Sequence, residues 1–422
     1  MDLSANPELV TLANGVRIAL DPMPGLGTAA LGVWQRVGAR WEPAEINGVA
    51  HLFEHMAFKG AGGRDARQFA EAIENVGGMI NAATGYERTA YYARVLAEHA
   101  PFALDLVADI LFAPHWEADE LEKEKGVVAQ ERGDAFDAAG DRAFELHQKA
   151  MFPDQPLGRP ILGEESTLAN VTVETLTEFA SAHLSPERLV VSIAGAFDRD
   201  RFLDAAEQRF GRLAHKPAPS FAPARVVPGK SAEARRIEQT HLVMSWPAPE
   251  AAGEQLYPAR LLADIFGGGM TSRLFQEVRE KRGLVYAIDA GHDKFEDVGR
   301  LSVYASCAAR DAATVAEIVQ EQLALLADKG PTGEELERAK TLANAGMLMA
   351  IETPSARAEV RVRQIFQRGR LGAFEEIRQN IEAVTAAEVQ AMARAALAGP
   401  AAGAIVGPKA GHGALAKFGA NS

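Results

Sequence analysis

The chain has 422 residues, of which 47% are hydrophobic and 24% charged, a composition typical of folded globular proteins and unlike that of intrinsically disordered chains. Its 57 acidic and 44 basic side chains give a formal net charge of −13, which argues against sequence-independent nucleic-acid binding, because such binding needs a basic surface. The single cysteine, Cys307, excludes a disulfide framework and a cysteine-based zinc site within one chain.

No apolar run reaches the roughly 18 residues of a membrane-spanning helix. Residues 1–20 lack the basic segment and apolar core of a secretory signal, and they are not an Arg-rich transit peptide. We therefore expect a cytoplasmic protein with neither a membrane partner nor a nucleic-acid partner.

The first elements along the chain alternate between strand and helix patterns. Residues 11–22 predict a hairpin that turns at Asn14-Gly15, and residues 31–40 predict another strand. Residues 48–60, GVAHLFEHMAFKG, then switch to helical spacing.

Three further segments complete the pattern of the first half. Residues 66–78 predict a helix that a pair of glycines ends. Residues 79–96 are rich in β-branched and aromatic residues and predict paired strands. Residues 118–137 predict a long charged helix, which Glu-to-Lys spacings support.

A segment rich in Pro, Ala and Ser, residues 214–232, lies near the middle of the chain and predicts an extended linker. We therefore divide the chain into a first domain, 1–213, the linker, and a second domain, 233–422.

The two predicted domains show a faint internal repeat. Residues 51–60 correspond to 261–270, and residues 118–131 correspond to 332–346, in the same order and at nearly the same offset. This indicates a duplication, although two similar charged helices could also coincide by chance.

His51, Glu54 and His55 form an H-x-x-E-H motif on a predicted helix. Positions i and i+4 lie roughly 40° apart around a helix, so both imidazoles can bind one tetrahedral zinc ion. Glu54 lies on the neighbouring edge of that face, where it can act as the general base that takes a proton from zinc-bound water. The alternative is a pair of half-buried histidines that simply hydrogen-bond to Glu54.

Zinc then needs a third protein ligand, which the long charged helix can supply. Glu131 and Glu124 are seven residues apart, so they lie about 20° apart on one face of that helix. One can bind the metal while the other supports the site. Their default interpretation, taken alone, is a solvated helix face.

These motifs together resemble the pitrilysin/insulinase/mitochondrial-processing-peptidase family of zinc peptidases, in its short two-domain bacterial form. The resemblance rests on HLFEHMAFKG with a glutamate 76 residues after its second histidine, on GGMINAATGYERTAYYARVL, and on SRLFQEVREKRGLVYAI in the second half. It covers the chain from about Leu12 to Ile405. Gly60-Ala61 stands where the family often has Gly-Thr, with no consequence that we identify.

The resemblance implies a metal site and its catalytic base. His51, His55 and Glu131 would bind one Zn²⁺ per chain, Glu54 would activate water, and Glu124 would support the site.

The resemblance also implies substrate contacts. Asn81 and Ala82 would lie on a strand edge that pairs with the substrate backbone, a form of β-augmentation. Arg279 and Tyr286 of the second domain would close over the substrate, where they could either stabilise the tetrahedral oxyanion or hold the scissile carbonyl.

The second copy has lost these ligands. Leu261, Asp264 and Ile265 correspond to the motif, and Ala339 and Gly346 correspond to the two glutamates. Zinc is therefore expected only in the first domain.

The implied fold is α+β, with two homologous domains that each consist of a mostly antiparallel sheet with helices packed on one face, arranged as a clamshell around a chamber. The implied assembly is a homodimer, or a heterodimer with a related chain.

We therefore predict a zinc-dependent endopeptidase that hydrolyses peptides or unfolded polypeptide segments inside a closed chamber. The alternatives are a non-catalytic scaffold subunit, a peptide-binding clamshell with slow turnover, and a two-His-one-carboxylate iron oxygenase. Glu54, placed between the ligands, and the family resemblance both oppose the oxygenase. Manganese or cobalt in place of zinc, the natural substrate and its pathway are left open by the sequence.

Overall fold

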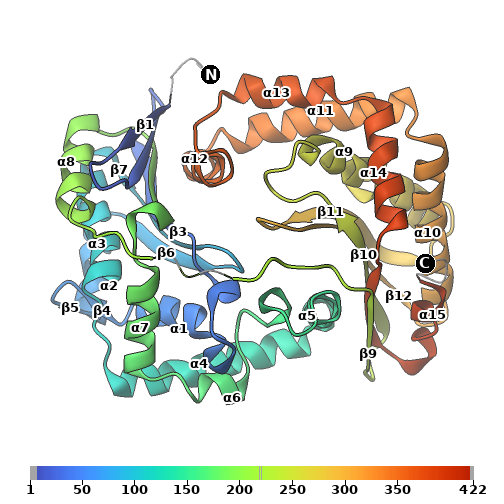
Figure 1. Ribbon diagram of the computed structural model, residues 1–422, viewed down its shortest axis with the longest axis horizontal. Helices are drawn as coiled ribbons and strands as arrows, with labels where there is room; N and C mark the ends of the chain where they lie inside the picture. Colours follow the sequence, from blue (N-terminus) through green and yellow to red (C-terminus); the bar gives the residue numbers. More distant parts are fainter. Residues whose placement is uncertain (1–6, 218, 220, 419–422) are drawn as a thin grey trace. The chain divides into compact units, whose positions relative to one another are not determined.

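The computed structural model describes residues 7–217, 219 and 221–418, and these fall into two compact units (Figure 1). Unit 1 contains the described residues of 1–131, 160–222 and 347–373, and unit 2 contains those of 132–159, 223–346 and 374–422. Each unit is built around one sheet with its own hydrophobic core.

The sheet of unit 1 has six strands in the order β1-β2-β8-β3-β7-β6. Their bounds are β1 Glu8–Thr11, β2 Arg17–Pro22, β3 Thr28–Gln35, β6 Met79–Thr84, β7 Thr89–Leu96 and β8 Leu189–Gly195. All neighbours pair antiparallel except β2 and β8. The hairpin predicted at Asn14-Gly15 is confirmed as the turn between β1 and β2.

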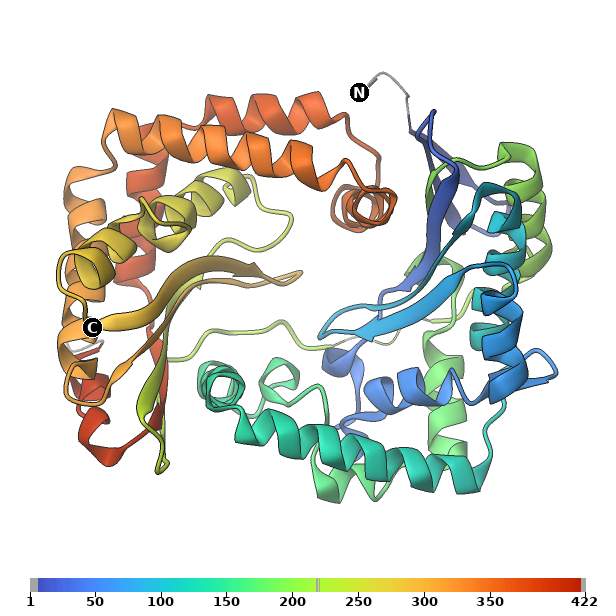
Figure 2. The ribbon, with the colours of Figure 1, turned by 180° about the vertical axis from the view of Figure 1, so that it is seen from behind.

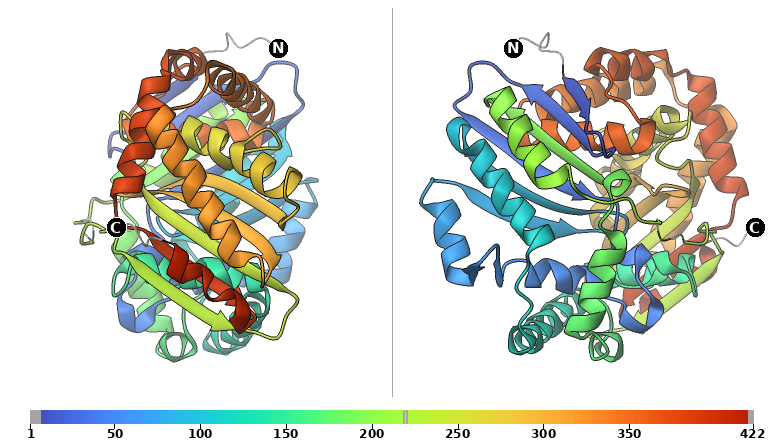
Figure 3. Two further views of the ribbon diagram at one scale, coloured as in Figure 1. Left: turned by 90° about the vertical axis from the view of Figure 1, so that its right-hand side faces the viewer. Right: turned by 60° about the vertical axis from the view of Figure 1, so that its left-hand side comes forward.

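The helices of unit 1 mostly cover one face of this sheet; Figure 3 shows α3 and α8 lying across it. Their bounds are α1 Val49–Met56, α2 Ala66–Glu74, α3 Ala100–Phe112, α6 Glu165–Leu168, α7 Val173–His183 and α8 Arg199–Phe210, and α4, Ala118–Asp137, begins in this unit. A short hairpin, β4 Gly60–Ala61 with β5 Arg64–Asp65, lies between α1 and α2.

The sheet of unit 2 has five strands in the order β11-β12-β10-β13-β9. Their bounds are β9 Gly229–Ala234, β10 Gln239–Ala248, β11 Val285–Lys294, β12 Gly299–Ala308 and β13 Ala402–Gly407. Its helices are α9 Leu256–Gly267, α10 Ala312–Lys329, most of α11 Gly333–Ala350, α13 Phe374–Ala383, α14 Ala386–Ala398 and α15 Ala414–Lys417, with a π-helical segment at Phe275–Glu280.

The strand orders of the two sheets confirm a duplicated α+β fold. Read from one edge, β6-β7-β3-β8-β2 matches β11-β12-β10-β13-β9, and in each series only the last pair is parallel. The sheets are therefore mostly antiparallel, as predicted.

Helices pack on one face of each sheet, and one further helix packs on part of the second face. Helix α12, Pro354–Arg368, packs on the second face of the unit 1 sheet, where Val362 and Ile365 join Ala19, Trp34 and Val190 in an apolar cluster. Helix α5, Ala139–Met151, similarly covers the second face of the unit 2 sheet. Each sheet carries apolar residues on this face too, so each needs a second cover.

The predicted linker, 214–232, extends too far at its C-terminal end, because its last four residues belong to a strand. Gly229–Ala234 forms β9, which pairs in parallel with β13. The predicted domains 1–213 and 233–422 are contiguous, but the compact units are not. Residues 132–159, from the first half of the chain, belong to unit 2, and residues 347–373, from the second half, belong to unit 1. Within the ranges that the structure describes, no helix is both long and apolar enough to cross a membrane.

A buried ion cluster attaches α12 to the sheet of unit 1. Asp21 on β2 is fully buried, and its carboxylate lies 2.7 Å from Nε of Arg361 and 3.0 Å from Nη2 of Arg357. Both arginines are at most 2% exposed. These charges depend on one another, because a buried ion that loses its partner keeps its full desolvation cost.

We predict that Asp21→Asn lowers the free energy of unfolding by about 3–5 kcal/mol, because it leaves two buried guanidinium groups without their carboxylate. Urea denaturation followed by circular dichroism measures this loss. The matched control is Glu8→Gln, which breaks the exposed pair with Arg199 and should leave the unfolding midpoint unchanged. Equal midpoints for Asp21→Asn and the parent would contradict the assignment.

Candidate metal centre

Helix α1 carries the H-x-x-E-H motif on its less buried side. The side that faces the core consists of Val49, Ala50, Leu52, Phe53 and Met56. Gly48 precedes the helix with φ +97°, and a Cβ there would come within 2.8 Å of Gly163 and Leu168. Glycine is therefore required where the chain enters α1.

His51 and His55 on α1 come together with Glu131 on α4. The ribbon of these two helices can be followed in Figure 2, in blue and in blue-green. One ligand atom from each lies within 4.8 Å of the other two. Oε2 of Glu131 is 3.4 Å from Nε2 of His55 and 3.8 Å from Nε2 of His51. Two imidazoles and one carboxylate are a donor set of catalytic zinc sites, which keep a fourth position open.

Glu124 occupies a different position from Glu131. Its Oε2 lies 3.0 Å from Nδ1 of His55, and its Oε1 lies 2.5 Å from Nζ of Lys59. If Nδ1 of His55 carries the proton, it donates to Glu124 and leaves the lone pair of Nε2 free for a metal. Glu124 is buried, whereas the side chain of Glu131 is 42% exposed.

Lys59 was not singled out from the sequence as a site residue. It lies three residues beyond the end of α1, so helical spacing from the motif does not place it beside the site. Its ammonium group balances the charge of the buried Glu124 carboxylate.

The electrostatic state of His51 also suits a metal ligand. Burial, and then the charge of His55, lower the pKa of His51 to about 4, so its imidazole is neutral at pH 7. Its Nδ1 is buried and has no hydrogen-bond partner among the described residues. The residues present therefore fit a zinc ion held by His51, His55 and Glu131.

Glu54 lies on α1 between the two histidines, and within the described ranges no lysine or arginine forms an ion pair with it. Its Oε2 is buried without a hydrogen-bond partner in the described part of the chain. Burial raises the pKa of Glu54, and the neighbouring Thr84 and His55 partly oppose the shift. A poorly solvated carboxylate beside the ligands is suited to accept a proton.

Asn81 and Ala82 lie on β6, the last strand of the unit 1 sheet. Oδ1 of Asn81 accepts the Ala82 amide at 2.8 Å. The strand borders a cavity of about 700 Å³, whose lining includes Phe58, Ile73 and Met79. An edge strand beside an apolar cavity can take up an extended chain and one of its side chains.

Arg279 and Tyr286 belong to unit 2. Arg279 lies in the π-helical segment, with its guanidinium 5.0 Å from the ring centre of Phe275. Tyr286 is on β11, and its side chain is 74% exposed. Their predicted role at the substrate stays a prediction.

The counterparts of the metal residues in the second half have different environments. Leu261 and Ile265 are buried in the core, and Asp264 pairs with Arg260 at 3.2 Å. Across the residues that the structure describes, the group of His51, His55 and Glu131 is the only one with three ligand-type side chains at metal-binding distance.

Comparisons with known proteins agree with this division of the chain. Residues 17–165 match the family "Insulinase (Peptidase family M16)", and residues 170–342 match "Peptidase M16 inactive domain". The protein named "Uncharacterized zinc protease YmxG" from Bacillus subtilis is 36% identical over 91% of this chain and 94% of its own. A Rickettsia felis protein named "Uncharacterized zinc protease" is 36% identical over 92% of this chain and 94% of its own.

The chain belongs to the insulinase (M16) family of peptidases. Two solved structures share its fold. A Pseudomonas fluorescens structure described as a peptidase M16 inactive domain has a TM-score of 0.89 at 21% identity, covering 96% of this chain and 98% of that one. A Helicobacter pylori protease has a TM-score of 0.87 at 18% identity, covering 96% of this chain and all of that one.

We predict that Glu131→Gln abolishes stoichiometric zinc binding, because it removes the carboxylate that faces both imidazoles. Glu124→Gln should weaken zinc binding by about 10–100-fold, because it loosens His55 without removing a ligand. The dissociation constant can be measured by competition with a chromophoric chelator. The control is Glu122→Gln on the same helix, an exposed residue paired with Lys125, which should bind zinc as the parent does. Equal affinities for the Glu131 variant and this control would refute the ligand assignment.

Proposed function

We propose that this M16-family protein is a zinc-dependent endopeptidase that hydrolyses peptides or unfolded polypeptide segments. The observation that carries the proposal is the position of Glu54, half-buried and with its Oε2 lacking a hydrogen-bond partner among the described residues, on the same helix as the two histidines of the ligand group. A structural metal site would have no need of an additional uncommitted carboxylate.

His51, His55 and Glu131 would hold the metal. A zinc ion at this site would supply Lewis-acid chemistry, which would make water a better nucleophile and polarise the scissile carbonyl. Glu54 accepts a proton from the attacking water and passes it to the leaving amine, which turns an unstable anion into a neutral product. Glu124 and Lys59 keep His55 oriented during these steps.

Strand β6 would bind the substrate through its backbone, with Asn81 and Ala82 at the pairing edge. Because such pairing recognises an extended chain more than particular side chains, it favours flexible peptides over folded proteins. We also propose that Arg279 and Tyr286 contribute positive charge and a hydrogen bond at the developing oxyanion. Assembly as a homodimer or with a related chain is part of the same proposal.

We predict that Glu54→Gln lowers kcat for a quenched fluorescent peptide by about 10²–10⁴-fold, because the amide cannot accept the proton. Zinc content should stay at that of the parent. Glu45→Gln, an exposed residue before the same helix, is the matched control and should keep full activity. Undiminished hydrolysis by the Glu54 variant would rule out its role as the base, and an inert parent with zinc bound would favour the non-catalytic peptide-binding alternative.

We predict that Tyr286→Phe lowers kcat by roughly 10-fold or more, with zinc affinity unchanged, because it removes one hydrogen-bond donor to the oxyanion. Steady-state kinetics on the same peptide measures this. Tyr257→Phe in the same unit serves as the control and should behave as the parent. A Tyr286 variant with parental kcat would show that the phenol takes no part in the reaction.

A further inference from the structure

A short 3₁₀ turn, Ala39–Trp41, and the residue that follows it contact two parts of the candidate metal centre at once. The turn precedes α1 in the sequence and lies beside the hairpin between β6 and β7. Neither Arg40 nor Glu42 in this segment belongs to the ligand group, yet they are 1% and 4% exposed. Buried charged side chains without a ligand nearby call for a structural reason.

Glu42 holds the beginning of α1. Its Oε2 accepts the amide of Gly48 at 2.8 Å and the side-chain amide of Asn47 at 2.6 Å, and its Oε1 accepts the amide of Ala50 at 2.8 Å. The first amides of a helix have no partners within the helix, and a carboxylate there also interacts favourably with the helix dipole. Ala50 directly precedes His51, so Glu42 fixes the backbone from which the first ligand projects.

Arg40 holds the hairpin of residues 85–88. Its Nη1 lies 2.6 Å from Oε1 of Glu87, and its backbone amide donates to the carbonyl of Tyr86 at 2.8 Å. The amide of Ala39 donates to the carbonyl of Gly85 at 3.1 Å. A Cβ on Gly38 would come within 2.2 Å of the Gly85 oxygen, so the turn and the hairpin are in direct backbone contact.

The hairpin matters to the site because Thr84, the last residue of β6, precedes it. Helix α1, which carries Glu54, packs against β6, so the end of this strand neighbours Glu54. The hairpin also ends the edge strand on which Asn81 and Ala82 lie. Moving residues 85–88 would therefore displace both the neighbour of Glu54 and the end of the substrate strand.

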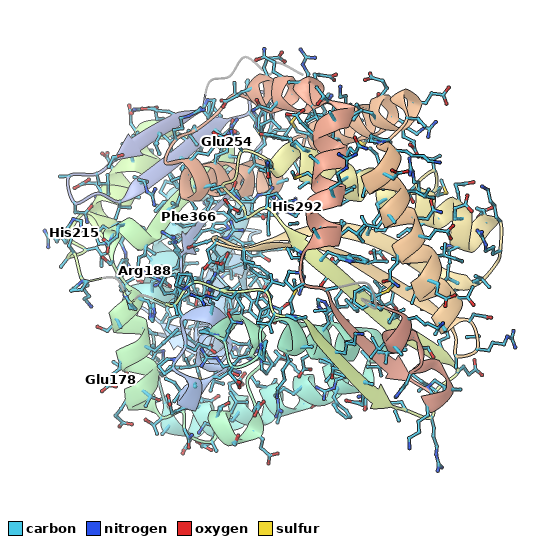
Figure 4. All side chains as sticks on the ribbon, turned by 45° about the vertical axis from the view of Figure 1, so that its right-hand side comes forward. Glu178, Arg188, His215, Glu254, His292 and Phe366 are labelled. Atoms are coloured by element: carbon cyan, nitrogen blue, oxygen red, sulfur yellow. The ribbon has the colours of Figure 1, made fainter. Side chains whose placement is uncertain are left out.

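An aromatic residue of the linker covers this turn. The guanidinium of Arg40 lies 3.7 Å from the ring centre of Phe221, and the ring of Phe221 meets that of Trp41 edge-on at 4.4 Å. Arg188, labelled in Figure 4, lies 4.0 Å from the Trp41 ring centre. The Phe221 ring covers the buried Arg40 guanidinium, and the exclusion of water there strengthens the pair of Arg40 with Glu87.

We propose that residues 39–42 form a positioning turn for the metal centre, in which Glu42 sets the start of the metal-binding helix and Arg40 sets the hairpin beside Glu54. The catalytic part of this inference rests on the proposed peptidase function. The turn joins the helix that supplies two ligands and the base to the strand that would bind substrate. Both must keep a fixed relative position, because small displacements of reacting groups reduce the rate strongly.

The test compares Glu42→Gln, Glu42→Asp and Arg40→Lys with the parent. In the Glu42→Gln variant an NH₂ group replaces one of the two acceptor oxygens. This donor would then face another donor, either a backbone amide or the side-chain amide of Asn47, and a hydrogen bond would be lost. The Arg40→Lys variant loses the planar guanidinium group that stacks on Phe221 and donates to Glu87. The control is Glu388→Gln in unit 2, where another glutamate caps a helix by accepting from Thr385.

We predict that Glu42→Gln weakens zinc binding by about tenfold and changes the visible absorption spectrum of the cobalt-substituted protein, which reports ligand geometry. Glu42→Asp keeps the charge and should retain more zinc affinity than Gln. Arg40→Lys should bind zinc as the parent does but lower kcat/KM by about tenfold. Glu388→Gln should match the parent in all three measurements.

Glu42 is merely structural if Glu42→Gln lowers only the thermal unfolding midpoint while zinc affinity and cobalt spectrum stay parental, and that result overturns the proposal. If the Gln variant does not fold, parental zinc affinity and cobalt spectrum in Glu42→Asp overturn it, and a measurable loss supports it. If the parent hydrolyses no peptide, the proposed function fails, while zinc affinity and the cobalt spectrum still decide the role of Glu42.

Discussion

The contact between Nδ1 of His55 and the buried carboxylate of Glu124 fixes the relative position of the two helices that carry the ligands. The residues are 69 positions apart, so the contact exists only when α1 and α4 are packed together. Leu121, Glu124 and Val128 form one buried stripe along α4. Glu131 follows Val128 on this stripe by less than one turn. Packing, ligand orientation and the placement of the third ligand thus depend on one helix interface.

The duplicated fold uses its two copies differently. Both sheets have the same strand order and the same parallel pair, and in each a helix, α1 or α9, packs at the corresponding position. In the first copy the helix carries His51 and His55 on its less buried side, whereas in the second Leu261 and Ile265 are core residues. The second copy therefore keeps the apolar core of the fold without the two imidazoles.

Much of the site could be predicted from the sequence because it depends on local geometry. The spacing of His51 and His55 on a helix follows from 3.6 residues per turn, and their proximity is observed. Periodicity placed Glu124 and Glu131 on one face but could not say which would face Nε2 of both histidines and which would contact Nδ1 of His55. That choice depends on the rotation of α4 against α1, which is a tertiary property.

Other features left little trace in the sequence. The amphipathic pattern of α12 shows that it needs a partner but not that the partner is the sheet of the other half of the chain. Residues 229–232 looked like linker because β9 is an edge strand with alternating exposure, and its pairing with β13 is nonlocal. Glu42 caps α1 from six residues before Gly48, a distance that no local capping motif specifies.

The proposed metal centre uses protein ligands from α1 and α4 alone. Anomalous diffraction at the zinc edge from crystals of the zinc-loaded protein tests this most directly. We predict one strong peak per chain, about 2.0–2.2 Å from a nitrogen of His51, a nitrogen of His55 and a carboxylate oxygen of Glu131. A strong peak elsewhere, or none at these three side chains under saturating zinc, would contradict the account.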